Sequence, residues 1–451
     1  MPPWLLLSPV IPRSAAIGHR AGRCLALPGN EILINSLSSL WQHWAQTVHQ
    51  TFHASHWVII YPRGLLGPGW DNSLEGGKSV SSCRLQTDVF IVGGGPAGLA
   101  AAIAARQRGL SVIVADGAAP PIDKACGEGL LPETLAALAE LGVAMPPVTG
   151  HPFRGIRFLQ NDVQVSAGFP AGQALGIRRT VLHARLIARA EQSGARLLWR
   201  TPVAGISAAG VHVSSGLVAA RWIVGADGSG SRVRRWAGLD RAAREKRRFA
   251  ARRHYRVAPW AEYAEIYWGP RAQAYVTPIH RAEVCVVVMA AQVEDTDFDL
   301  FLKDCPQLAA RLGGAELSSR ERGAVTLMHS LASVHSGNIV LVGDASGGVD
   351  AITGEGLRLA FRQALVLASA IEQDDLRFYA RAHRALIRKP MFIGDILLAH
   401  GKNNRLRTRS LRMLAKRPHL FSRLLALQSG NAPWEDVLAA GAQFGWRFLA
   451  A

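Results

Sequence analysis

The sequence has few cysteines and no long apolar run. None of its 451 residues falls in an apolar stretch of 18 or more, so we expect no membrane-spanning helix. The apolar start MPPWLLLSPVIP has no positive charge before it and is interrupted by prolines, which argues against a secretory signal. The five cysteines are scattered without a C-x-x-C pair, so neither a disulfide framework nor a metal site is indicated. This cysteine usage favours a reducing cytoplasm.

Acidic residues are also scarce, with 33 Asp or Glu against 51 Lys or Arg and a formal net charge of +18. The imbalance is greatest in residues 376–451, which hold 14 Lys or Arg and three acidic residues in a largely helical pattern. A basic face can attract anionic lipid, phosphorylated or CoA-linked substrates or nucleic acid, or it can simply be solvated. No nucleic-acid-binding motif accompanies the charge, so nucleic acid is the least favoured partner.

From Thr87 the sequence reads as a strand–helix–strand unit. Residues 88–92 form a buried-strand run, residues 97–108 an alanine-rich helix, and residues 111–115 a second strand. This spacing predicts a βαβ unit with a parallel strand pair. Residues 1–86 contain none of the motifs described below, and we expect them to form a poorly defined N-terminal extension.

The turn between the first strand and the helix carries a G-x-G-x-x-G motif. Its members are Gly93, Gly95, Pro96, Ala97 and Gly98. Its glycines permit a tight turn, close approach of a pyrophosphate and close helix–strand packing, while the helix N-terminus offers N–H groups to phosphates. Asp116, at the end of the second strand, is placed to accept the ribose hydroxyls of an adenosine. The motif predicts a dinucleotide ligand without separating NAD from FAD.

Two later motifs favour FAD. Asp227-Gly228 follows one predicted strand, and Gly343-Asp344 ends another. The order and spacing of the three motifs resemble those of the flavin monooxygenase and reductase group with the p-hydroxybenzoate hydroxylase fold. The resemblance covers about residues 87–395. It implies that Asp344 bonds the ribityl chain of FAD, that Asp227 and Gly228 lie by the pyrophosphate, and that Arg179 lies beside the cofactor.

The resemblance also implies an α/β fold with a discontinuous, Rossmann-like FAD-binding domain. That domain would comprise residues 87–150, 179–240 and 335–375. An inserted α+β substrate domain would comprise residues 151–178 and 241–334, followed by a basic helical C-terminal region of residues 376–451.

A narrower resemblance concerns the stretch 124–132, KACGEGLLP, which is similar to the K-x-C-G-E-G signature of geranylgeranyl-reductase-like flavoproteins. The same resemblance implies that Gly354 and Gly356 of this chain open a helix whose N-terminus stabilises negative charge on the reduced flavin. Glu355 should then cap that helix or turn away. The resemblance places Cys126 near the flavin as a candidate proton donor, with a role as a small buried hydrophobe equally open.

Three functions remain open at this point. The first is an FAD-dependent reductase of C=C bonds in a small hydrophobic substrate, isoprenoid- or polyketide-like and in some cases carrier- or CoA-linked, with NAD(P)H as electron donor. The second is an FAD-dependent monooxygenase acting on an aromatic or lipid substrate. The third is a peripheral membrane flavoprotein whose basic residues 405–423 dock it on anionic lipid.

Overall fold

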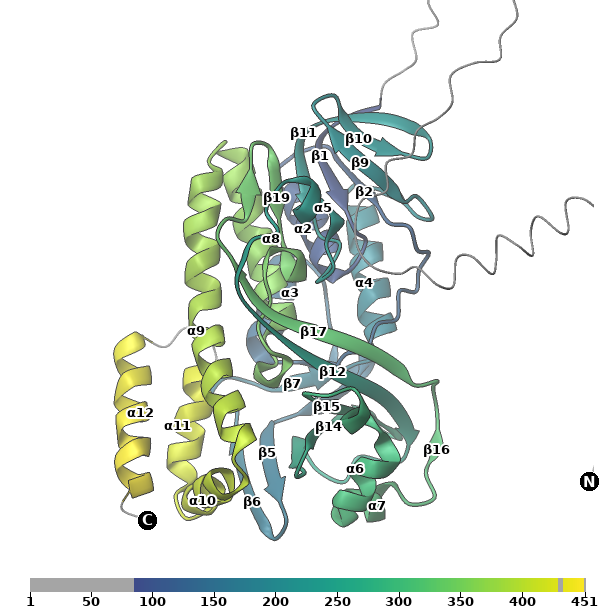
Figure 1. Ribbon diagram of the computed structural model, residues 1–451. Coiled ribbons are helices and arrows are strands. Elements are labelled where there is room, and N and C mark those ends of the chain that lie inside the picture. Colours follow the sequence, from purple (N-terminus) through teal and green to yellow (C-terminus); the bar gives the residue numbers. More distant parts are fainter. Residues whose placement is uncertain (1–84, 429–432, 450–451) are drawn as a thin grey trace, which may run out of the picture. The chain divides into compact units, whose positions relative to one another are not determined.

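The first sheet carries the predicted dinucleotide-binding unit (Figure 1). The computed structural model describes residues 85–428 and 433–449. The sheet has the order β18-β19-β11-β1-β2-β8, and β9 and β10 extend β11 as an antiparallel meander. Its strands are β1 (Leu85–Val92), β2 (Val112–Ala115), β8 (Arg196–Leu198), β9 (Val203–Ser207), β10 (Gly210–Val213), β11 (Gly216–Gly225), β18 (His335–Ser336) and β19 (Ile339–Leu341).

Strand β1 lies at the centre of this sheet and pairs in parallel with both β2 and β11. Its alternate side chains point to opposite faces, as the two-residue period of a strand requires. Val89 and Ile91 pack in the core that includes α2 (Pro96–Gln107) and α8 (Gly356–Glu372). Phe90 and Val92 pack in a second core with residues of the β9–β10–β11 meander. Because the chain leaves β1 toward β2 and later returns on its other side, a crevice opens at the carboxyl ends of these strands.

Helix α2 starts at Pro96, the first-turn position that proline tolerates best, and its residues from Leu99 to Ala105 are all buried. Small alanine side chains let α2 pack closely against α8 and against α4 (Arg179–Gln192). Helices α3 (Pro132–Glu140) and α5 (Arg232–Trp236) complete this part of the molecule.

The second sheet has the order β16-β12-β15-β14-β13-β5-β6, with β17 paired to β12. Figure 1 shows the long strands β12 and β17 running from beside α8 into this sheet. The strands are β5 (Gly155–Gln160), β6 (Val163–Gly168), β12 (Ala242–Arg256), β13 (Tyr263–Trp268), β14 (Ala272–His280), β15 (Glu283–Ala290), β16 (Glu316–Leu317) and β17 (Arg322–Leu331). Helices α6 (Phe298–Asp304) and α7 (Pro306–Leu312) pack on one face of it through Phe298, Phe301 and Leu308. A third, small sheet has the strand order β3 (Gly129–Leu130), β7 (Ala174–Gly176) and β4 (His151–Phe153).

The basic C-terminal region is a set of helices, of which the first packs along α8 and the next two pack on β6 of the second sheet. They are α9 (Leu376–Lys402), α10 (Asn404–Ala415), α11 (Pro418–Gln428) and α12 (Trp434–Leu449). Leu411 and Leu414 of α10 and Phe421 of α11 share one core with Val165 of β6. Arg407 lies on the buried side of α10 and donates to the side chain of Gln160, so this arginine serves packing. No described helix combines the length and the apolar character needed to cross a membrane.

The described part of the chain belongs to a compact unit, Ser81–Ala451, while most of the extension expected for residues 1–86 lies outside the described residues. We predict that a chain starting at Ser81 binds FAD as tightly as the full chain, because every motif of the candidate site lies after that point. The two proteins are compared by FAD titration and by thermal unfolding. A shortened protein that keeps its melting temperature but loses FAD would show that the N-terminal residues contribute to the site.

Candidate active site

A cavity of about 670 Å³ is lined by the carboxyl ends of the first sheet and by strands of the second. It brings together nearly all the predicted site residues, which are far apart in the sequence. The lining includes Gly93, Gly95, Pro96, Ala97, Asp116, Cys126, Arg179, Asp227, Gly228, Gly343, Asp344, Gly354 and Gly356. Gly98 does not line the cavity, because it lies further along α2, under the turn.

The glycine turn is shaped by close backbone contacts. A Cβ on Gly98 would lie 1.9 Å from the carbonyl oxygen of Gly93, and one on Gly93 (φ +111°) would lie 2.5 Å from that of Ala226. Both glycines therefore let the helix, the turn and the neighbouring strand approach each other. At Gly95, by contrast, a Cβ would meet no atom within 4 Å. The first turn of α2 thus presents its N–H groups to open space, as phosphate binding requires.

The carboxylate of Asp116 is fixed at the end of β2. It accepts hydrogen bonds from the backbone N–H groups of Gly94 (2.7 Å) and Ala118 (2.8 Å). These bonds tie the glycine turn to the next strand, and the side chain still lines the cavity. The position suits a group that accepts from ribose hydroxyls.

The Asp-Gly loop has a structural role of its own. Asp227 accepts from the hydroxyl of Ser231 and, at 2.7 Å, from the backbone N–H of Arg232. Its carboxylate therefore holds the start of α5 and shapes the loop in which Gly228 adopts φ +82°. Asp227 lines the cavity, but the bonds that the structure shows are to its own loop.

The Gly-Asp turn is supported from behind by α8. The N–H of Gly343 donates to the side-chain oxygen of Gln363 at 2.7 Å, and a Cβ at Gly343 would lie 2.6 Å from that of Ala97. The next residue, Asp344, is half exposed in the cavity wall, 3.5 Å from the ammonium of Lys124. The turn thus places a carboxylate in the cavity beside the glycine turn.

His183 is a site residue that sequence reasoning missed. Its Nε2 lies 2.8 Å from the carbonyl oxygen of Gly94, and its Nδ1 accepts from the N–H of Ile122 at 3.3 Å. Burial lowers the pKa of this imidazole, so a neutral ring that donates from Nε2 satisfies both contacts. His183 thereby fixes the glycine turn to the loop after β2. A lone histidine on a helix carries no signal of this role in the sequence.

Glu355 turns away from the cavity, one of the two outcomes expected for it. Although it occupies the N-cap position of α8, its side chain makes no capping bond and instead pairs with Arg358. Burial raises the pKa of Glu355 to about 7. Burial therefore favours the protonated carboxyl, and the ion pair with Arg358 balances its charge when it is ionised. The N-terminus of α8, which lies at the cavity, thus keeps the positive end of the helix dipole.

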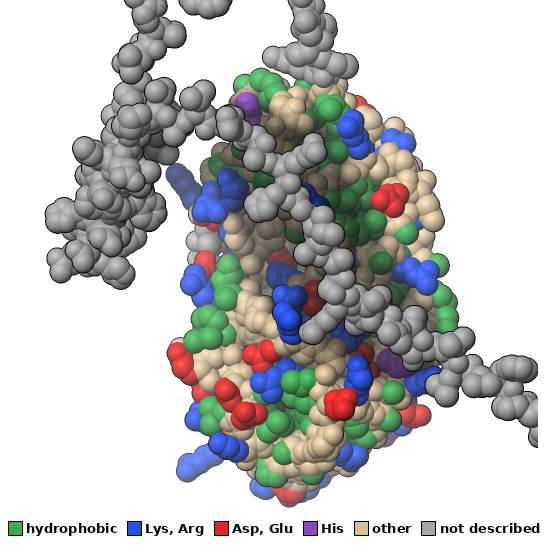
Figure 2. Space-filling model, turned by 90° about the vertical axis from the view of Figure 1, so that its right-hand side faces the viewer, with side chains coloured by type: hydrophobic (Ala, Val, Ile, Leu, Met, Phe, Trp, Pro, Cys, Tyr) green, Lys and Arg blue, Asp and Glu red, His purple; other side chains and the backbone are tan. Residues whose placement is uncertain are grey.

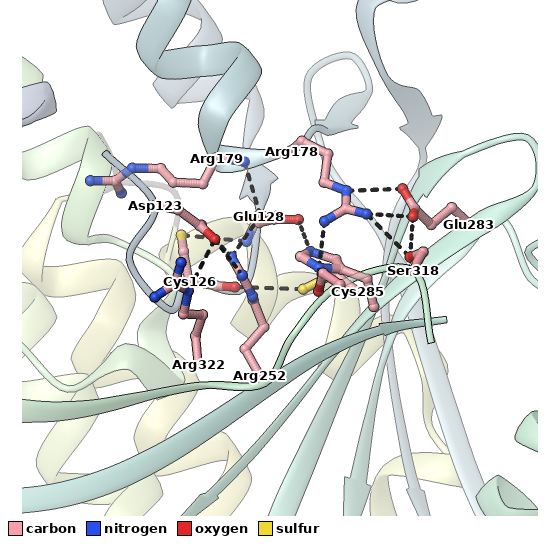
Figure 3. A network of polar contacts seen from close by, with 12 residues as sticks. Asp123, Cys126, Glu128, Arg178, Arg179, Arg252, Glu283, Cys285, Ser318 and Arg322 are labelled. Atoms are coloured by element: carbon pink, nitrogen blue, oxygen red, sulfur yellow. Dashed lines mark hydrogen bonds and ion pairs between the residues drawn. The ribbon is translucent and has the colours of Figure 1, made fainter. Parts of the chain in front are cut away.

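Figure 3 shows a network of buried polar groups behind Cys126, centred on Glu128. Glu128 is a non-glycine residue at φ +58°, and its side chain is 1% exposed. Its carboxylate accepts from the N–H of Arg179 (2.9 Å), lies 3.3 Å from the guanidinium of Arg252, and lies 2.7 Å from Nε2 of His254. The carboxylate therefore joins three elements: the 124–132 loop, the start of α4, and strand β12.

The same network positions the two neighbouring arginines differently. Arg178 pairs with Glu283 and contacts Nδ1 of His254, so it points into the second sheet. Arg179 lines the cavity, and its Nε is buried without a hydrogen-bond partner among the described residues. The sequence offers two adjacent arginines at this point, and the structure directs Arg179 toward the cavity.

Cys126 lies between this network and the cavity. Its thiol sulfur accepts from the N–H of Glu128 at 3.4 Å, and its carbonyl accepts from the thiol of Cys285 at 3.5 Å. Burial raises the pKa of Cys285, which keeps that thiol protonated. Cys126 itself is partly exposed and lines the cavity. The thiol of Cys126 thus lies at the cavity wall, and the thiol of Cys285 on β15 lies beneath the loop.

Glu128, His254 and Cys285 have ligand atoms within 4.8 Å of one another, an arrangement that could suit a metal ion. Two cationic side chains occupy this region instead: Arg252 contacts Glu128, and Arg178 contacts His254. Asp123 adds a second carboxylate to Arg252 at 2.8 Å, and that hydrogen bond lowers the pKa of Asp123. The cluster is therefore an ion-pair network in which guanidinium groups balance the acidic charge.

The remaining cavity wall is mainly apolar and comes from the second sheet, from β4 of the small sheet, from the start of α3 and from the loop before α8. It includes Phe153, Ile156, Ile266, Leu131 and Ile352. Tyr275 also lines it, and burial raises the pKa of this phenol, which therefore stays protonated at neutral pH. Such a wall accommodates a hydrophobic molecule beside the polar half of the cavity.

Comparison with known proteins assigns the family. Residues 86–374 match the model of the FAD binding domain, and the chain belongs to this family. It is 29% identical over 336 residues to menaquinone reductase of Mycolicibacterium smegmatis, covering 67% of this chain and 81% of that protein. It is 26% identical over 328 residues to digeranylgeranylglycerophospholipid reductase 1 of Methanothermobacter thermautotrophicus, covering 64% and 79%.

Among solved structures, a flavoprotein/dehydrogenase from Cytophaga hutchinsonii has a similar fold. The TM-score is 0.69 at 16% identity, covering 81% of this chain and 99% of that one. Together with the family, this confirms the predicted fold and the prediction of an FAD-dependent oxidoreductase.

The cavity fits FAD on the evidence of its own residues. The open space before Gly95, Gly228 and Gly356 leaves room for a ligand against bare backbone. The unpartnered Nε of Arg179 provides a buried donor. We propose that the glycine turn holds the pyrophosphate of FAD and that the start of α8 faces the flavin ring. In this arrangement Asp116 accepts from the ribose of the adenosine, and Asp344 accepts from the ribityl chain.

Asp344 gives a direct test of this assignment. A carboxylate bonded to a ribityl hydroxyl is a charge-assisted contact worth about 1.5–3 kcal/mol, so Asp344→Ala should weaken FAD binding roughly ten- to a hundredfold. FAD titration by flavin fluorescence measures the change. Asp374→Ala, at an exposed pair with Arg221, is the matched control and should bind FAD normally. Equal affinity in the two variants would remove Asp344 from the site.

Proposed function

We propose that this chain reduces C=C bonds of a hydrophobic substrate of isoprenoid or polyketide type. The observation that carries the proposal is the 124–132 loop, which holds the Cys126 thiol at a cavity whose other wall is apolar. FAD, when bound and reduced by the electron donor, would supply the hydride for such a reduction. The second carbon of the bond needs a proton, and the thiol of Cys126, which lines the cavity, is the donor in this proposal.

The other residues of the site serve binding, orientation and exclusion of water. Glu128 keeps the loop that bears Cys126 against α4 and β12. Phe153, Ile156 and Ile266 exclude water from the substrate half of the cavity, which strengthens electrostatic interactions there. The names of the two reductases to which the chain is similar support a substrate with isoprenoid character.

The electron donor in this proposal is NADH or NADPH. The experiment mixes the purified, FAD-loaded protein with either nicotinamide under anaerobic conditions and follows bleaching of the flavin. A polyprenylated quinone and a polyprenylated glycerolipid are then added separately, and a CoA-linked prenyl chain is tested beside them. Products are identified by mass spectrometry.

The product mass distinguishes the reductase from the monooxygenase. Gain of two hydrogen atoms without oxygen, located in the prenyl chain by fragmentation, supports the reductase. Gain of one oxygen atom, seen only when air is admitted, would replace it with the monooxygenase. If no prenylated compound reoxidises the bleached flavin, the isoprenoid part of the proposed substrate class is wrong.

A further inference from the structure

The solvent face of α10 carries a stripe of positive charge. Arg405, Arg409, Arg412 and Lys416 are all exposed and are spaced at i, i+4, i+7 and i+11, so they lie along one side of the helix. The opposite side is buried against β6 through Leu411 and Leu414. The packing fixes the helix, and its charged face therefore points steadily outward.

Helix α12 adds an apolar surface beside this stripe. Its inner side packs through Val437 and Ala440 into a buried core with Leu427. Its outer side exposes Leu438 (62%) and Trp446 (70%), which are two turns apart on one face. A 16-residue helix with apolar side chains on both sides does not match a helix that faces only water.

The two features are adjacent. The guanidinium of Arg409 lies 4.6 Å from the ring centroid of Phe448, near the end of α12. Figure 1 shows α10, α11 and α12 grouped beside β5 and β6, and α12 contacts both other helices. Residues 396–434 include eight Lys or Arg and no acidic residue. By contrast, acidic and basic side chains are intermingled on the lower half of the face in Figure 2.

We propose that α10 and α12 form a docking surface for an anionic lipid bilayer. In this arrangement Leu438 and Trp446 enter the interfacial layer, and the α10 stripe contacts lipid phosphates. Indole rings favour the level of the lipid headgroups, and long basic side chains reach phosphates while their stems stay apolar. An acidic protein surface could pair with the basic stripe of α10, but it would not offer Leu438 and Trp446 of α12 the apolar layer that a bilayer provides. The proposal does not depend on the reaction catalysed.

The test is co-sedimentation of the full, FAD-loaded protein with vesicles. One set contains phosphatidylglycerol and phosphatidylcholine, and the other contains phosphatidylcholine alone. We expect binding to the anionic set, with a partition coefficient that falls as salt is raised. Changing the four stripe residues to Gln should lower the partition coefficient by roughly several hundredfold, because each basic residue near an anionic surface contributes about fivefold. Trp446→Ser should also weaken binding while the charge is unchanged.

Two controls distinguish binding by the α10 and α12 surface from an effect of the total net charge and from an effect of misfolding. Arg185→Gln, Arg196→Gln, Arg200→Gln and Arg281→Gln remove four exposed charges elsewhere and should leave binding unchanged. Lysine in place of the three stripe arginines should preserve binding to the anionic vesicles. The FAD content of each variant reports whether it is folded. Absence of binding to anionic vesicles, or an equal loss in the control variant, would overturn the proposal. Reductase activity can fail or succeed independently of this result.

Discussion

Replacing Arg252 by methionine should destabilise the protein by about 3–5 kcal/mol, because it leaves a buried carboxylate without its charged partner. Arg252 is 0% exposed and lies between Glu128, which is 1% exposed, and Asp123. Asp123 can turn to water or to Arg322, which lies 3.4 Å away. Glu128 has no such access to solvent. Its carboxylate would retain only the N–H of Arg179 and the ring of His254.

Chemical denaturation of the parent protein and of Arg252→Met measures the difference in the free energy of unfolding. Arg256→Met lies on the same strand at an exposed pair with Glu316 and should change stability by less than about 1 kcal/mol. Adding Glu128→Gln to Arg252→Met should recover part of the loss, because the uncompensated charge is then gone. A double variant no more stable than Arg252→Met would show that the guanidinium acts mainly by packing.

The sequence predicted the parts of the site that depend on backbone shape. Glycines at fixed offsets after a strand are required by close contacts, such as that of Gly98 with the carbonyl of Gly93, and so they leave a readable spacing. The carboxylates of Asp116 and Asp344 follow predicted strands of one sheet, and parallel strands bring their carboxyl ends to one edge. The sequence alone therefore predicts that these residues lie near one another.

The groups that support the cavity could not be predicted in this way. His183, Arg252 and His254 are ordinary members of a helix and a strand, and their roles arise from side chains that meet across elements far apart in the chain. The basic C-terminal residues raise a similar difficulty. Their sequence does not distinguish Arg407, which is buried and bonded to Gln160, from Arg405 and Arg409, which face solvent.

Substitution of Cys126 should slow the reaction with substrate and leave FAD binding and flavin reduction unchanged. Its thiol lines the cavity, and the N–H of Glu128 fixes its position. Proton transfer from a positioned side chain typically contributes about 10²–10⁴-fold to a rate, and this is the loss expected for Cys126→Ala. Cys126→Ser keeps a hydroxyl of similar size but of much higher pKa, so it should be slowed as well and be no slower than the alanine variant.

The comparison that decides the role of Cys126 is made by rapid mixing. Flavin bleaching by the nicotinamide and its reoxidation by the prenylated substrate are timed separately for the parent and both variants. Cys305→Ala is the matched control, because that thiol lies between α6 and α7 and does not line the cavity. Parental reoxidation rates in both Cys126 variants would make the thiol a packing group. The protonated phenol of Tyr275, which lines the same cavity, would then be the next side chain to replace.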